Sequence, residues 1–191
     1  MVDAIVEGIK DRVGVAIKVN QTVGIQVPEN RHEDLKEALF NIMKSNKKDV
    51  WTLLSASDTY YNISKKFEGL SEYSNINFID CISKAAGVSE IQGNCKYVES
   101  PTMLEIVSLY IMNNFKGLKD DVEKYIVIDS LSSLMLYNGN ETIREFLSLL
   151  MNKTRYQNIH VVTILIEEEV GSDKILQMND KIVLLRDSFI E

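Results

Sequence analysis

Short apolar runs alternate along this chain with longer segments whose apolar residues recur at helical spacing. Seven runs rich in aliphatic and β-branched residues predict strands, at residues 13–19, 22–27, 50–55, 76–82, 125–129, 160–167 and 182–186. Several of these runs are apolar at consecutive positions, which is typical of strands covered by helices on both faces. The alternation therefore predicts an α/β fold with βα units around a mostly parallel sheet.

The helical segments are defined by apolar positions three and four residues apart. One such stripe comprises Leu35, Ala38, Leu39, Ile42 and Met43, and a second comprises Ile143, Phe146, Leu147, Leu150 and Met151. We expect Asn140 to cap the second helix and Pro101 to begin a third. Residues 84–96 are polar and predict a loop, while residues 2–10 predict a small helical addition at the N-terminus.

Composition narrows the class of protein. A chain of 191 residues with 45% hydrophobic residues fits one domain with a sizeable core, and we take 1–191 as a single domain. The net charge of -7 opposes nonspecific binding to nucleic acids and anionic membranes. The apolar runs are far shorter than the roughly 20 residues that span a bilayer, and the N-terminus has no signal pattern. We therefore expect a cytoplasmic protein without a membrane segment.

Candidate metal ligands are few. Two cysteines, Cys81 and Cys95, and two histidines, His32 and His160, have no spacing typical of a metal site. We expect no metal centre and two reduced thiols, with Cys81 buried in an apolar run.

One acidic residue stands at the end of a predicted buried strand. Residues 125–128 are apolar, and Asp129 and Ser130 follow them directly. The carboxyl end of a strand in an α/β sheet faces the crevice where such sheets bind ligands. An acid at such a strand end also often caps a turn, so the position alone leaves both interpretations open.

The surrounding sequence resembles the KaiC branch of the RecA superfamily. The resemblance rests on IVIDSLSSL at 126–134, the amphipathic helix 141–156, the strand HVVTILI and the final strand KIVLLR, and residues 77–83 resemble archaeal KaiC-like proteins. It covers roughly residues 20–190, with 1–20 as an addition. It implies a RecA-like P-loop NTPase core, a twisted sheet flanked by helices on both faces, in which Asp129 matches the Walker B acid that holds Mg²⁺.

The phosphate-binding motif of that family is degenerate here. Active members carry GxxxxGK(S/T) after the first core strand, because glycines expose backbone N–H groups to phosphate and the lysine neutralises its charge. This chain reads PENRHEDL at 28–35, with Glu33 at the lysine position and Asp34 at the hydroxyl position. Two carboxylates there would repel a triphosphate, and we expect them to stabilise the helix N-terminus instead. Arg31 is the candidate for a substitute phosphate clamp.

The catalytic position departs from the family in the same way. KaiC-like ATPases carry a pair of glutamates after the next strand, whereas this chain reads LLSASD at 53–58. Asp58 could take the role only after a change of register, and a helix N-cap by Ser57 or Asp58 is the favoured interpretation. With lysine, hydroxyl and base all absent, ATP hydrolysis by the usual route is not expected.

DNA binding is also disfavoured. RecA relatives contact DNA through loops that correspond here to 136–140 and 167–174, and the second contains Glu167, Glu168 and Glu169. Consecutive glutamates repel a phosphate backbone. The acidic loop is either a solvated surface or a docking surface for a basic partner.

Three functions follow from this pattern. The first is a catalytically inactive RecA/KaiC-like domain that regulates or scaffolds a protein partner or an active paralogue, without a cofactor. The second is a nucleotide-binding protein or ATPase with a rebuilt site of Arg31, Asp129 and Ser130 that takes Mg-ATP, with Asp129 as the metal contact. The third is a DNA recombination or repair accessory. The residues are compatible with a monomer, a dimer or a mixed complex.

Overall fold

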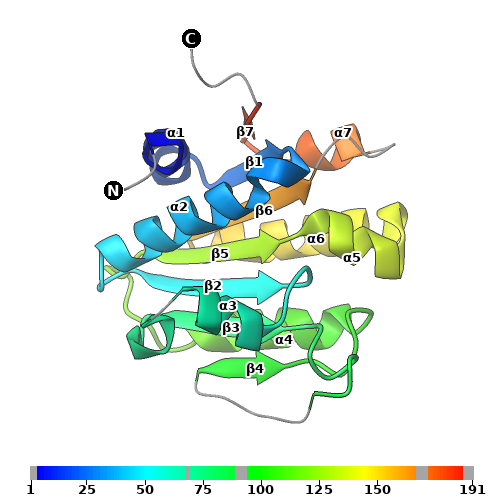
Figure 1. Cartoon of the computed structure of the whole chain (residues 1–191). Coiled ribbons are helices and arrows are strands. Elements are labelled where there is room, and N and C mark those ends of the chain that lie inside the picture. Colours follow the sequence, from blue (N-terminus) through cyan, green and yellow to red (C-terminus); the bar gives the residue numbers. More distant parts are fainter. Residues whose placement is uncertain (1–3, 68, 89–93, 167–171, 187–191) are drawn as a thin grey trace.

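A single parallel sheet organises the chain, as shown in the computed structural model, which describes residues 4–67, 69–88, 94–166 and 172–186 (Figure 1). Its strand order is β4-β3-β2-β5-β6-β1-β7. The strands are β1 (Thr22–Val27), β2 (Val50–Ser55), β3 (Ile76–Asp80), β4 (Cys95–Tyr97), β5 (Lys124–Asp129), β6 (Ile159–Ile166) and β7 (Lys181–Leu184). All pairings between neighbouring strands are parallel, so their carboxyl ends share one edge.

Helices cover both faces of the sheet, as the sequence predicted (Figure 1). One face packs against α1 (Ala4–Val19), α2 (His32–Ser45) and α3 (Tyr60–Lys66), and the other against α4 (Leu104–Phe115), α5 (Leu131–Asn138), α6 (Asn140–Tyr156) and α7 (Ser172–Leu176). Two 3-10 turns, η1 (Glu29–Arg31) and η2 (Leu70–Glu72), complete the described elements. None of the described helices has the length and apolar character needed to cross a membrane.

The central strand β5 shows why consecutive apolar residues are needed. Tyr125 and Val127 belong to the core on the α1, α2 and α3 face. Ile126 and Ile128 belong to the core on the opposite face. Because successive side chains of a strand point to opposite faces, a strand buried on both sides is apolar at every position.

The prediction of a strand at 13–19 is wrong, because these residues form the second half of α1. The buried residues of α1 are Val6, Ile9, Val13, Ala16 and Ile17, which recur three and four residues apart. The β-branched residues in this segment favour a strand locally, but burial of the helical stripe against α2 decides the conformation. The N-terminal addition is therefore one long helix.

Other boundaries also differ from the predictions. The polar segment 84–96, predicted as a loop, contains the first residues of the short edge strand β4. The helix expected from Pro101 begins at Leu104. Asn140 is the first residue of α6 and not its cap, because Gly139, at φ 75°, joins α5 directly to α6. The remaining six predicted strands are present: β1 and β2 have the predicted bounds, and the other four differ by one or two residues at an end.

Asp80 holds the carboxyl end of β3 together. Its buried carboxylate accepts hydrogen bonds from the backbone N–H groups of Ile82 and Ser83, both at 2.8 Å, and from the Ser83 hydroxyl at 2.6 Å. It also accepts from the Tyr60 N–H at 2.7 Å, at the start of α3. One carboxylate therefore fixes both the turn after β3 and the first residue of a neighbouring helix.

We predict that Asp80→Ala lowers the free energy of unfolding by about 3 kcal/mol, because two buried N–H groups and one partly buried N–H group lose their acceptor. Chemical denaturation monitored by circular dichroism measures the change. Asp121→Ala, at an exposed position, is the control and should stay within about 0.5 kcal/mol. Equal effects of the two substitutions would contradict the role assigned to Asp80.

Candidate functional site

Asp129 ends β5 in the middle of the sheet, between β2 and β6. The residue is 1% exposed, and its backbone carbonyl accepts a hydrogen bond from the Ala56 N–H at 2.7 Å. The Asp129–Ser130 peptide bond is cis. The central strand of the sheet thus presents a buried carboxylate at the edge where α/β folds bind ligands.

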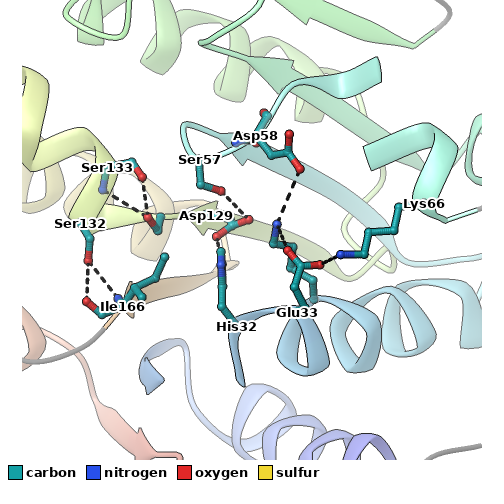
Figure 2. A network of polar contacts seen from close by, with 12 residues as sticks. His32, Glu33, Ser57, Asp58, Lys66, Asp129, Ser132, Ser133 and Ile166 are labelled. Carbon is teal, nitrogen blue, oxygen red and sulfur yellow. Dashed lines mark hydrogen bonds and ion pairs between the residues drawn. The ribbon is translucent and has the colours of Figure 1, made fainter. Parts of the chain in front are cut away.

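Both oxygens of the Asp129 carboxylate contact protein groups (Figure 2). His32 Nε2 donates to Oδ1 at 2.6 Å, and Ser57 Oγ donates to Oδ2 at 3.1 Å. His32 is the first residue of α2, and Ser57 lies in the turn between β2 and α3. The two loops that follow β1 and β2 therefore converge on the acid at the end of β5.

The segment after β1 folds into the short turn η1 and then enters α2. Arg31 Nη1 forms an ion pair with Asp34 Oδ2 at 3.0 Å, within the same segment. The predicted phosphate clamp is thus engaged by the carboxylate three residues away. The N-cap residue of α2, Arg31, makes no side-chain capping hydrogen bond, and Glu33 and Asp34 lie in the first turn of the helix, where the helix dipole favours acids.

Glu33 belongs instead to a cluster with two lysines. Lys36 Nζ lies 2.9 Å from Glu33 Oε1 and 3.9 Å from Asp58 Oδ2, and Lys66 pairs with the other Glu33 oxygen (Figure 2). Burial disfavours the charged form of Glu33, but hydrogen bonds and positive charge from Lys66 and Lys36 outweigh it, so its pKa is lowered. The cluster neutralises the one lysine that is buried near Asp129.

Lys36 and Asp129 also border a small interior cavity. Its remaining lining is apolar and comes from α2, α3 and the central strands: Leu39, Phe40, Met43, Leu53, Ile63, Val127 and Ile164. The cavity measures about 10 Å³, close to the smallest space that holds one water molecule. A phosphate group does not fit there without movement of the surrounding side chains.

Ser130 is fully buried and is the N-cap of α5. Its hydroxyl accepts a hydrogen bond from the Ser133 N–H at 3.2 Å and lies 3.0 Å from the Ser133 hydroxyl. The hydroxyl of Ser132, the second residue of α5, donates to the Ile166 carbonyl at 3.2 Å and accepts from the Ile166 N–H at 2.9 Å (Figure 2). The serines after Asp129 thus cap α5 and attach it to the end of β6.

Sequence reasoning missed the partners of Asp129. Ser57 and Asp58 were expected to cap a helix, but Thr59 is the N-cap of α3 and accepts from the Asn62 N–H at 3.3 Å. Ser57 contacts Asp129 across 72 positions of sequence, and His32 does so across 97. No local spacing links these residues, since only the strand order brings them together.

Two further sequence predictions bear on the site. Among the described residues, no group of three or more His, Cys, Asp or Glu side chains could hold a metal ion. The acidic stretch of Glu167, Glu168 and Glu169 lies outside the described residues.

The fold is similar to two solved archaeal structures. No protein-family model and no curated protein sequence matches the chain. The uncharacterized protein PH0321 from Pyrococcus horikoshii, crystallised with an unknown peptide, has a TM-score of 0.64 at 16% identity, over 94% of this chain and 82% of that one. The KaiC-like protein PH0186 from Pyrococcus horikoshii OT3 has a TM-score of 0.56 at 14% identity, over 90% and 74%. The chain therefore has a KaiC/RecA-like fold, as the sequence predicted.

We predict that His32 and Asp129 stabilise the fold jointly. In a double-mutant cycle with His32→Ala and Asp129→Ala, the pair should show a coupling energy of about 1 to 3 kcal/mol, because each single substitution leaves a buried polar partner. Denaturant unfolding of the four proteins measures it. The exposed pair Arg144 and Glu141 is the control, with coupling below about 0.5 kcal/mol. Additive effects of the two substitutions on the free energy of unfolding would show that the contact between His32 and Asp129 does not stabilise the fold.

The two cysteines are buried beside Asp80. Burial raises the pKa of Cys81 and of Cys95 to about 12, and the charge of Asp80 adds to the effect. A raised pKa keeps both thiols neutral and unreactive at pH 8, since the thiolate is the nucleophile.

We predict that neither thiol reacts with DTNB at pH 8 in the native protein at the rate of a free cysteine. At pH 8 the fraction of each cysteine present as thiolate should be about a thousandfold lower than that of a free cysteine. In guanidinium chloride both should react at once. A rapidly reacting thiol in the native protein would show that one cysteine is accessible and activated.

Proposed function

We propose that this chain is a catalytically inactive KaiC/RecA-like domain that acts in the cytoplasm as a regulatory or scaffolding protein. The observation that carries the proposal is the closure of the Asp129 carboxylate by His32 and Ser57. In a P-loop NTPase the corresponding acid faces Mg²⁺ and the nucleotide phosphates. Here that role would require the acid to lose two protein partners in a site that is 1% exposed.

The segment after β1 supports the same proposal. It offers no glycine between residues 28 and 35 to let backbone N–H groups approach a phosphate. Glu33 and Asp34 stand at the positions that match the family's lysine and hydroxyl. Each carboxylate would oppose a bound triphosphate by about 1 kcal/mol or more at partly screened distances. We therefore interpret this segment as a degenerate Walker A motif.

The alternative is a nucleotide site rebuilt from Arg31, Asp129 and Ser130, with Mg-ATP as its ligand. Lys36 favours it in one respect, because a buried cation lies beside Asp129. Its charge, however, is already matched by Glu33 and Asp58, and Arg31 is paired with Asp34. A rebuilt site would have to break these ion pairs as well as the contact between His32 and Asp129, so we rank it second.

A protein partner or an active paralogue is the ligand we propose for the domain. One structural neighbour was crystallised with an unknown peptide, so a protein of similar fold holds a peptide. The fold offers long helices and a sheet edge for such contacts, independent of a nucleotide.

We predict that Mg-ATP, Mg-ADP and GTP at millimolar concentration neither shift the melting temperature nor release heat in calorimetric titration. A ligand present at 100 times its Kd would stabilise the fold by about 2.7 kcal/mol, which both methods resolve. An active P-loop ATPase measured in parallel is the positive control for the assay. The Asp129→Asn variant tests whether any response to nucleotide depends on Asp129.

Magnesium-dependent hydrolysis that disappears in Asp129→Asn would overturn the proposal. Binding without hydrolysis that is lost in Asp129→Asn would instead favour the rebuilt site. Circular dichroism of the variant shows whether it remains folded.

A further inference from the structure

Helix α4 carries apolar residues on the side that faces away from the sheet. It packs against β2 and β3, on the face of the sheet that it shares with α5, α6 and α7 (Figure 1). Its buried residues are Val107, Ile111 and Phe115, which recur every four residues along the inward side. The outward side of a helix that is covered on one face is normally polar. Here Leu109 is 52% exposed and Met112 is only partly buried, so the outward side presents apolar surface to solvent.

Four residues of α4 form one stripe along this outward side. Glu105, Leu109, Met112 and Lys116 follow one another at intervals of four, three and four residues, which places them in line along a helix. Glu105 lies in the first turn of α4, and Lys116 is its C-cap, about three turns further on. The stripe therefore has a negative end, an apolar middle and a positive end.

The two charges of the stripe are not satisfied within the domain. Glu105 and Lys116 are both exposed, and within the described residues neither forms an ion pair. Their Cα atoms are about 16 Å apart along the helix axis, which is too far for the two side chains to pair with each other. Each charge can therefore pair only with a group on another molecule.

The stripe is complementary to its own reverse. When two copies of α4 lie antiparallel about a two-fold axis, Glu105 faces Lys116 of the partner subunit and Leu109 faces Met112 of the partner subunit. A parallel arrangement would place each charge against an identical charge, which is unfavourable. A different protein would need the same residue types in the reverse order, whereas a second copy has them because its sequence is the same. The charges thus select a second copy in the antiparallel orientation.

We propose that two copies of this chain associate through α4 as an antiparallel, two-fold symmetric pair. Leu109 and Met112 form the centre of the interface, and Glu105 and Lys116 form one ion pair at each end. One helix pair buries less than the roughly 800 Å² per partner of a standard stable interface, so we expect a dissociation constant in the micromolar range. The pairing goes beyond the inactive-domain proposal and is independent of it, because the stripe lies on α4 and not at Asp129.

Sedimentation velocity of the full chain, from micromolar to millimolar concentration at physiological ionic strength, tests the proposal. We expect a reversible equilibrium between monomer and dimer. Leu109→Asp places a charge at the centre of the interface twice in each dimer, and it should weaken association about tenfold or more. The matched control is Leu149→Asp on α6, since Leu149 is 65% exposed, and it should leave the dissociation constant within about twofold of that of the parent chain.

Two charge reversals test the antiparallel orientation. Glu105→Lys places two positive charges at each end of the pair, and Lys116→Glu places two negative charges there. Each variant alone should associate at least about fivefold more weakly than the parent chain. An equal mixture of the two variants restores an ion pair at both ends between unlike copies, so it should associate within about twofold of the parent chain. Glu145→Lys, at an exposed position of α6, controls for the change in net charge and should have no such effect.

Three results would overturn the proposal. The first is a monomer over the whole concentration range, which would leave the stripe to solvent or to a different protein. The second is a dimer that Leu109→Asp does not weaken, which would place the interface elsewhere. The third is a mixture of the two charge variants that does not associate, although circular dichroism shows both to be folded. The inactive-domain proposal would survive each of these results, because nucleotide binding and hydrolysis test it separately.

Discussion

The contact between His32 and Asp129 is the constraint on which the carboxyl edge of the sheet depends. A carboxylate that is 1% exposed is costly unless hydrogen-bonded groups or opposite charge compensate it. A ligand or a metal can provide that compensation in an enzyme. Here α2 provides it through its first residue, and the turn after β2 provides the second hydrogen bond through Ser57. The helix that would begin at a bound phosphate in a P-loop protein begins at the acid itself.

The same rule governs Asp80, two strands away. Its carboxylate accepts mainly from backbone N–H groups, at the start of α3 and after β3, and also from the Ser83 hydroxyl, whereas Asp129 accepts from the side chains of His32 and Ser57. Ser130 and Ser132 satisfy the start of α5 and the end of β6 in a similar way. Within the described residues, the polar groups that follow β2, β3 and β5 thus bind one another. This internal satisfaction offsets the cost of burying these polar groups at the carboxyl edge of the sheet.

The sequence predicted the parallel sheet and the place of Asp129 at the end of a buried strand, but not the partners of that acid. Consecutive apolar residues in β5 identify a strand buried on both faces, and this signal is local. The β-branched residues of α1 gave the wrong local preference, because contact with α2 decides their conformation. His32 and Ser57 carry no recognisable motif, since their role follows from the neighbouring positions of β2 and β5 and from where α2 begins. Residues that act through tertiary pairing alone are outside the reach of spacing arguments.

The two edge strands of the sheet, β4 and β7, differ in what limits pairing with a further strand. β4 has three residues, so it exposes little backbone to a further strand. β7 is longer, lies beside exposed apolar residues of α1 and carries Lys181 at its start. A lysine at an edge opposes pairing between identical strands, because like charges would lie opposite each other. The two edges thus resist further strand pairing in different ways, β4 through its short length and β7 through its charge.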